Sequence, residues 1–179
     1  KKNKKVKKVK NLIYFENSKY LDVVDEISSE LVKTGRNFNK ICGKDIRKDL
    51  MFFNRGVFNE ILSQILTWNS IKIKYNSDVR KVLNYIFFKD LLYISLLKIN
   101  LKSIHLDKLY TTNYISEISL LLGAKAKHVV AFKRGITGIG PELSCVGVDS
   151  IFVKDEIENK LFKEFRINKN TKVLTAFLY

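Results

Sequence analysis

The sequence predicts an α/β or α+β fold, a single mixed domain with a basic N-terminal arm. Two observations support this prediction. Short apolar runs typical of strands alternate with apolar residues at helical spacing, and the chain is 46% hydrophobic with twelve Phe, eight Tyr and one Trp, enough to build a core. Residues 18–90 are rich in helical patterns, and strand and helix patterns alternate over residues 91–179. We therefore expect a basic extension at 1–10 and one domain at 11–179.

The first elements expected are one strand and one helix. Residues 11–15 are apolar and predict the strand, after which Asn17 or Ser18 can cap a helix and Gly35 can end it. The apolar face of that helix consists of Leu21, Val24, Ile27 or Ser28, and Leu31. Its acidic residues, counted together with the preceding carboxylate, are Glu16, Asp22, Asp25, Glu26 and Glu30. We expect the acidic face to point away from any polyanion.

The middle of the chain predicts helices with one strand among them. From Lys44 the pattern indicates helices interrupted near Gly56, with an apolar stripe from Phe58 to Leu66. Residues 70–75 alternate apolar side chains with Lys72 and Lys74, which predicts a half-buried strand with a basic outer face. Residues 76–78 cap a helix that reaches about Phe88. Residues 91–106 are too short and too often interrupted by lysine for a membrane span, and predict one or two strands.

The last third of the chain predicts alternating helices and strands. A helix is expected over 109–122, ended by Gly123, and a strand over 127–133. A glycine-dense segment, residues 134–142, separates it from a strand over 146–153. Asp155 caps a helix that ends at Phe165, and residues 172–179 predict the last strand.

The charge of the chain indicates a polyanionic partner. The formal net charge is +15, and seven lysines lie within the first ten residues. A compact chain with this imbalance gains from a partner that supplies phosphates, because contact releases counterions. The 27 lysines against six arginines, with abundant Asn, Ile, Phe and Tyr, are also typical of an AT-rich genome. Lysine acts as a point charge toward phosphate, so the sequence predicts backbone contact rather than readout of bases.

The glycine-dense segment is the best candidate site in the sequence. Lysine and arginine flank it, and glycine lets backbone N–H groups approach a phosphate without a Cβ in the way. It is neither a P-loop nor the GxGxxG of dinucleotide-binding folds. Residues 135–138 match the GxxG of a KH module, although a predicted strand precedes them instead of a helix. A tight turn between strands is the other interpretation.

The sequence contains no motif that indicates catalysis, a metal or a cofactor. Ser144 and Cys145 lie near the glycine-dense segment, but the two histidines, His105 and His128, have no acidic partner at a suggestive spacing. Cys42 and Cys145 are far apart and form no CxxC, so we expect two reduced thiols. We therefore expect a protein that is not an enzyme and needs no cofactor.

Small size, a basic arm and a Lys-rich body together resemble ribosomal proteins of organelles, especially mitochondrial ones. Within that type, residues 109–140 resemble the helix, strand and glycine loop of the eleventh small-subunit ribosomal protein, where Lys127 to Gly135 is followed by Gly138 and Gly140. The second helix, the proline-containing basic tail and the upstream glycine-rich segment of that family are not found here. The resemblance implies a structural, rRNA-binding role in translation with neighbouring ribosomal proteins as partners.

The resulting expectation is an RNA-binding component of a ribonucleoprotein, located in a mitochondrion or other organelle, or else in the cytoplasm. Two alternatives are a nucleic-acid-binding accessory protein of an AT-rich virus, plasmid or parasite, and a peripheral subunit of an organellar membrane complex. The residues expected to contact nucleic acid are Lys1, Lys2, Lys4, Lys5, Lys7, Lys8, Lys10, Lys72, Lys74, Lys125, Lys127, Lys133, Arg134, Gly135, Gly138 and Gly140.

Overall fold

The chain forms two compact units in a computed structural model that describes residues 8–48, 55–133 and 141–175. The first unit comprises residues 1–48 and 103–179, and the second comprises residues 49–102. The second unit is therefore inserted in the sequence between two parts of the first.

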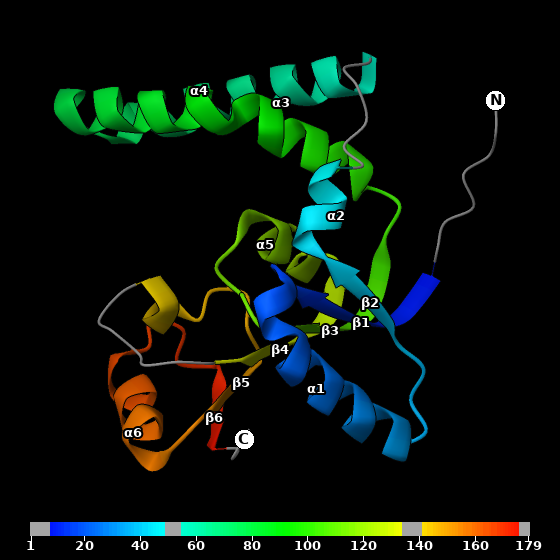
Figure 1. Ribbon diagram of the computed structural model, residues 1–179. Coiled ribbons are helices and arrows are strands. Elements are labelled where there is room, and N and C mark those ends of the chain that lie inside the picture. Colours follow the sequence, from blue (N-terminus) through cyan, green and yellow to red (C-terminus); the bar gives the residue numbers. More distant parts are fainter. Residues whose placement is uncertain (1–7, 49–54, 134–140, 176–179) are drawn as a thin grey trace. The chain divides into compact units, whose positions relative to one another are not determined.

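A parallel sheet of six strands is the centre of the first unit (Figure 1). The strand order is β2-β1-β3-β4-β5-β6, and every neighbouring pair is parallel. Their bounds are β1 Lys8–Phe15, β2 Asn39–Cys42, β3 His105–Thr111, β4 Ala126–Phe132, β5 Ser150–Val153 and β6 Lys172–Thr175. The chain moves outward from β1 to β2, then returns to the other side of β1 with β3 and continues outward from there.

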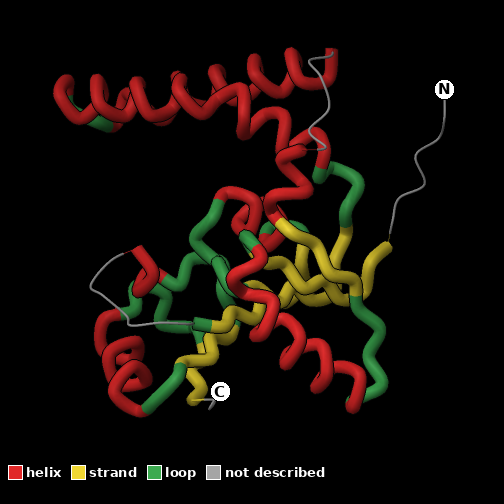
Figure 2. The backbone as a smooth tube through the Cα atoms, viewed as in Figure 1, coloured by secondary structure: helices red, strands yellow, loops and turns green. Residues whose placement is uncertain are grey.

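Helices lie on both faces of this sheet, as Figure 2 shows by colour. The longest in this unit is α1, Leu21–Lys33, which follows a 3-10 turn at Ser18–Tyr20. Asn17 caps that turn, with its side-chain oxygen accepting from the Lys19 N–H at 3.0 Å. Gly35 ends the helix at φ +67°, a left-handed conformation that glycine adopts without a Cβ clash. The others are α2 Gly43–Lys48, α5 Glu117–Gly123, a 3-10 turn at Pro141–Ser144 and α6 Glu156–Phe165.

The core has two layers because side chains of a strand alternate between the two faces of the sheet. On one face, α1 buries Val24, Ile27 and Leu31 against Ile13 and Tyr110. On the other, α5 and α6 pack against strands β3 to β6. The fully buried residues of that second layer include Leu109, Ile118, Leu122, Ile151, Val153 and Phe162.

The second unit is a helical hairpin. Helix α3, Arg55–Ile71, is joined to α4, Ser77–Asn100, through a 3-10 turn at Lys72–Lys74. Asn76 caps α4, since its side chain accepts from the Val79 N–H at 3.0 Å. Trp68 stacks on Phe87 with ring centroids 5.1 Å apart, so the hairpin has an interior of its own.

The α/β class is confirmed, together with most of the elements predicted at its two ends. The strand at 11–15 lies within β1, and the caps by Asn17 and Asp155 are both present, with α6 ending at Phe165 as expected. The strand expected over 127–133 is β4, and the strand expected over 146–153 is the shorter β5. β6 covers 172–175 of the last expected strand, whose residues 176–179 lie outside the described range.

Three predictions in the middle of the chain are wrong. Residues 70–75 end α3 and form a 3-10 turn, so Lys72 and Lys74 do not lie on a strand. Residues 91–100 continue α4 instead of forming strands. Their apolar pattern suits a strand as well as a helix, and they directly follow the helix that Asn76 caps. Residues 109–111 belong to β3, and the helix expected over 109–122 begins only at Glu117.

The apolar stripe of α3 is also placed differently from expectation. Phe58, Leu62 and Leu66 are 49%, 44% and 70% exposed instead of forming a buried face. Separately, none of the helices in the described part of the chain is long and apolar enough to cross a membrane.

Candidate functional site

The strand order of the sheet reverses between β1 and β3, and this position gathers polar side chains. At such a reversal, the segments that follow the two adjacent strands run in opposite directions and leave a crevice between them. Open α/β sheets bind ligands in this crevice, at the carboxyl ends of the strands. Here β1 ends at Phe15 and is followed by Glu16 and Asn17. The neighbouring β3 ends at Thr111 and is followed by Thr112 and Asn113.

A hydrogen-bonded cluster connects these segments. The Tyr14 hydroxyl donates to the Glu16 carboxylate, and it lies 3.3 Å from the Ser116 hydroxyl. The Arg47 guanidinium of α2 also donates to Glu16 and forms a salt bridge with it. Glu16 is largely shielded from solvent, with 16% of its side chain exposed, so the carboxylate is held in a fixed position by two donors.

Gly43 makes room for this cluster at the start of α2. A Cβ at that position would lie 2.7 Å from the Tyr14 hydroxyl oxygen and 3.2 Å from Glu16 Oε2. Only glycine fits there without moving the Tyr14 hydroxyl or the Glu16 carboxylate. The close approach of α2 to the end of β1 therefore depends on the absence of a side chain.

Thr112 supplies a buried hydroxyl with no partner at the same place. Its side chain is 8% exposed, and its Oγ1 atom has no hydrogen-bond partner among the described residues. A buried hydroxyl without a partner costs roughly 1–3 kcal/mol. The neighbouring Thr111 hydroxyl, in contrast, accepts from the Ser119 hydroxyl at 3.0 Å. The end of β3 thus leaves one hydrogen-bonding group for a ligand.

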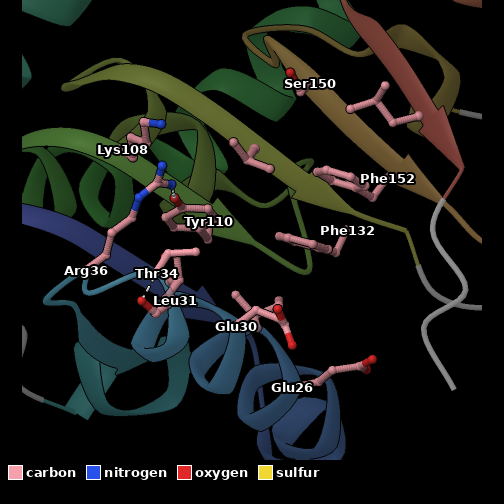
Figure 3. Close-up of a pocket in the computed structure, with 13 residues that line it drawn as sticks. Glu26, Glu30, Leu31, Thr34, Arg36, Lys108, Tyr110, Phe132, Ser150 and Phe152 are labelled. Atoms are coloured by element: carbon pink, nitrogen blue, oxygen red, sulfur yellow. Dashed lines mark hydrogen bonds between the residues drawn. The ribbon is translucent and has the colours of Figure 1, made fainter.

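A groove lies beside α1 on the face of the sheet that this helix covers only in part (Figure 3). Its volume is about 440 Å³, within the roughly 300–1,000 Å³ of small-molecule sites. Its floor is aromatic. Phe132 and Phe152 stack with ring centroids 5.2 Å apart, and Tyr110 lies 6.5 Å from Phe132.

Charged side chains of opposite sign line different parts of the groove. Glu26 and Glu30 come from α1, whereas Arg36 and Lys108 lie together near Tyr110, and Figure 3 shows both cationic ends converging there. Arg36 Nη1 donates to the Tyr110 hydroxyl at 3.4 Å. The acidic face of α1 is therefore partly turned toward this groove and not wholly toward solvent.

Phe132 is the groove residue that comes nearest to the end of β3 in the strand register. Thr111 pairs with Ala131, so Thr112 follows beside Phe132, the last residue of β4. Thr112 itself does not line the groove.

The structure separates the basic residues that the sequence singled out. Lys125 and Lys127 lie at the amino end of β4, whereas Lys133 follows its carboxyl end, roughly 20 Å away along a strand of this length. Lys72 and Lys74 belong to the other compact unit. Within the first unit, Lys133 therefore forms no common patch with Lys125 and Lys127.

Lys127 also has a carboxylate partner. Its ammonium lies 2.8 Å from Asp107 Oδ1, and that hydrogen bond raises the pKa of Lys127. Both side chains are well exposed, so this ion pair is weak. A phosphate that binds Lys127 must nevertheless displace the Asp107 carboxylate.

The remaining predicted contacts fall at or beyond the edges of the described chain. Lys8 is the first residue of β1 and Lys10 is exposed on the same strand. Outside the described residues lie Lys1, Lys2, Lys4, Lys5, Lys7, Arg134, Gly135, Gly138 and Gly140.

Sequence reasoning missed the residues of the polar cluster. Glu16 was counted with the acidic helix, and Thr112 was assigned to a helix. A usable signal was present at the end of β1, because Glu16 and Asn17 directly follow its apolar run, but the strand order that brings the ends of β1 and β3 together cannot be read from one sequence.

No metal-binding group of three or more His, Cys, Asp or Glu side chains occurs in the described ranges, and Cys42 and Cys145 form no disulfide. Comparisons with protein-family models, with curated protein sequences and with solved structures found no match.

Proposed function

We propose that the protein binds a nucleoside phosphate at the carboxyl ends of β1 and β3, with the base over the aromatic floor of the groove. The observation that carries this proposal is the reversal of strand order between β1 and β3, next to which the buried Thr112 hydroxyl has no described partner. The proposal concerns binding and assigns no reaction to the site.

The side chains present match the three parts of such a ligand. The Glu16 carboxylate and the Ser116 hydroxyl are suited to sugar hydroxyls, which act as both donors and acceptors. Arg47 and Lys133 provide positive charge for phosphate near the same strand ends. The stacked rings of Phe132 and Phe152 offer an apolar surface of the kind on which bases stack.

Calorimetric titration of the full chain with a panel of nucleotides tests this proposal. The panel contains the diphosphates of adenosine, guanosine, cytidine and uridine, with ribose 5-phosphate and inorganic phosphate as controls. Saturable one-to-one binding of at least one nucleotide, stronger than that of either control, is expected. If none of the four nucleotides binds, or if inorganic phosphate binds as strongly, the proposal is wrong.

We propose RNA binding as a second function, favoured by the net charge of +15 and the seven lysines among the first ten residues. In that case the protein is a structural component of a ribosome that holds rRNA phosphates. Within the described part of the chain, Lys8 and Lys10 of β1 continue this basic run in sequence, and Lys125 and Lys127 lie at the amino end of β4, two strands from β1.

Deleting residues 1–7 tests the RNA proposal without shortening β1, which begins at Lys8. We expect lower RNA affinity and a salt dependence flatter by several units, since each phosphate contact contributes about 0.7–0.9 to the slope. An unchanged slope would show that the arm does not contact RNA. Co-sedimentation with ribosomal subunits in high salt separates a ribosomal role from general nucleic-acid binding, which is lost at modest salt.

A further inference from the structure

The α3–α4 hairpin carries most of the exposed apolar surface of the described chain. Twelve of the twenty-one large hydrophobic side chains that are exposed lie between Phe58 and Leu92. They are Phe58, Leu62, Leu66, Ile71, Ile73, Tyr75, Val79, Val82, Tyr85, Ile86, Phe88 and Leu92. Single exposed apolar residues are ordinary on protein surfaces, whereas a concentration of this size on one element marks an interaction surface.

This surface is separate from the interior of the hairpin, which is already well paired. Gln64 donates to the Ser95 hydroxyl at 2.7 Å, and the Trp68 indole N–H donates to the Asn84 side-chain oxygen at 2.7 Å. The Lys98 ammonium lies 2.9 Å from Glu60 Oε1. These contacts fix which faces of α3 and α4 meet, so the exposed apolar residues face outward from the hairpin.

Two of the most exposed apolar residues of the hairpin lie near the end where α3 passes into α4. Ile73 is 72% exposed and Leu66 is 70% exposed. Lys72 and Lys74 alternate with Ile71 and Ile73 in the connecting turn. A large apolar side chain held in water beside lysines is costly unless something covers it.

Positive charge accompanies these apolar residues. Between Leu66 and Val82 the sequence contains four cations, Lys72, Lys74, Arg80 and Lys81, against the single carboxylate of Asp78. Lys81 lies 3.5 Å from Asp78, whereas no carboxylate bonds to Lys72 or Lys74 among the salt bridges of the described residues. The turn is therefore both apolar and cationic.

The combination of exposed apolar side chains and lysines favours one of two possible binding partners for this surface. A second copy of the hairpin would bury the apolar residues but would bring like charges together, which is unfavourable. An anionic lipid surface satisfies both features, since apolar side chains enter the acyl boundary while lysines remain at the level of the headgroup phosphates. Lysines near such a surface are attracted to its anionic headgroups.

We infer that the end of the α3–α4 hairpin binds an anionic lipid surface through Leu66, Ile73, Lys72 and Lys74. The inference concerns the second compact unit alone and does not depend on the nucleotide site of the first. The hairpin lies on the lipid surface, with its apolar side chains in the acyl boundary and its lysines against the headgroup phosphates.

Co-sedimentation of the full chain with lipid vesicles tests the inference. Vesicles of phosphatidylcholine alone are compared with vesicles that also contain phosphatidylglycerol, at low and high salt. We expect binding to the anionic vesicles, weaker at high salt, and little binding to phosphatidylcholine. Absence of binding to the anionic vesicles would overturn the inference.

Two pairs of variants separate the apolar and the charged contributions. Ile73→Ser is compared with Ile167→Ser, because Ile167 is similarly exposed at 76% but belongs to the first unit. The double variant Lys72→Glu with Lys74→Glu is compared with Lys160→Glu with Lys163→Glu, two exposed lysines of α6. Ile73→Ser and the first double variant should each weaken vesicle binding by roughly tenfold, whereas their controls should not.

Three results would contradict the inference. The first is equal loss of vesicle binding in the hairpin variants and their controls, which would indicate non-specific charge attraction. The second is a dimer in light scattering that Ile73→Ser dissociates, with no vesicle binding, which would assign the surface to a second copy. The third is binding of single-stranded RNA that the Lys72 and Lys74 variant loses while no vesicle binding is seen.

Discussion

The backbone N–H of Thr112 donates a hydrogen bond to the carbonyl oxygen of Tyr14, with 3.3 Å between the two atoms. This bond extends the pairing of β1 with β3 by one residue beyond the end of β3. It fixes Thr112 at the point where the strand order reverses. The hydroxyl of Thr112, which has no partner among the described residues, is therefore held in a defined position at the carboxyl end of β3.

Replacing Thr112 by Val tests whether that hydroxyl serves a ligand. We expect Thr112→Val to leave the free energy of unfolding unchanged or slightly increased, because an unpaired buried hydroxyl is replaced by a methyl group of similar shape. Nucleotide affinity should fall by roughly tenfold, equivalent to about 1.4 kcal/mol. Denaturant unfolding and calorimetry measure the two quantities.

Thr171→Val is the matched control for that experiment. Thr171 is also buried, but its hydroxyl donates to the Val148 carbonyl oxygen at 2.7 Å. Its replacement should cost about 1–3 kcal/mol of stability and leave nucleotide affinity unchanged. If Thr112→Val is as destabilising as Thr171→Val, then its hydroxyl has a partner within the protein.

A methyl group at Gly43 should disturb the polar cluster directly. In Gly43→Ala the new Cβ approaches the Tyr14 hydroxyl to 2.7 Å, so the pairing of Tyr14 with Glu16 must shift. We expect nucleotide affinity to fall by at least roughly tenfold. Gly35→Ala is the control, since its φ of +67° makes alanine unfavourable by about 1 kcal/mol while its surroundings are open. That variant should lose stability but not affinity.

The aromatic floor can be tested with a conservative change. Phe152→Leu keeps an apolar side chain but removes the ring that stacks on Phe132. We expect nucleotide affinity to fall by about 1–3 kcal/mol if the base stacks there. Phe165→Leu changes a half-exposed ring of α6 outside the groove and should have no such effect. If the two variants bind nucleotide with equal affinity, the base does not stack on Phe152.

Because the Cys145 thiol is buried, we expect the protein to lose stability at alkaline pH. Burial raises the pKa of Cys145 from its ordinary 9.0 to about 11. Between these values the unfolded chain has lost the thiol proton and the folded chain retains it, so the free energy of unfolding falls as pH rises from about 9 to about 11. Below pH 9 this contribution is fully present.

Denaturant unfolding at a series of pH values measures that fall. Cys145→Ala should flatten the dependence between pH 9 and 11. Alkylation of the native protein at neutral pH should modify Cys42 well before Cys145. A steep alkaline loss that persists in Cys145→Ala would assign it to other groups.

The parts of the fold that the sequence predicted correctly are those with strong local signals. Asn17, Gly35 and Asp155 act through hydrogen bonds or dihedral angles within a few residues of their own position, so the boundaries of α1 and α6 were predictable. The strand β4 was predictable because its apolar run is bounded by lysines.

The errors arose where tertiary structure overrides local preference. Residues 91–100 are apolar in a pattern that suits a strand as well as a helix, and their continuity with the Asn76-capped helix decided the outcome. The faces of α3 that are exposed could not be predicted from hydrophobicity, since residues such as Leu66 are apolar but exposed. The site could not be predicted either, because the ends of β1 and β3 become neighbours only through the order of the strands.

The most direct test of the proposed site is a nuclear magnetic resonance titration that follows backbone amide signals of the full chain. The nucleotide that binds most tightly in calorimetry is added to saturation. We predict that the largest shifts occur at Glu16, Asn17, Thr112 and Asn113, with further shifts at Phe132 and Phe152. Saturable binding that leaves these signals unchanged would contradict the site at the carboxyl ends of β1 and β3.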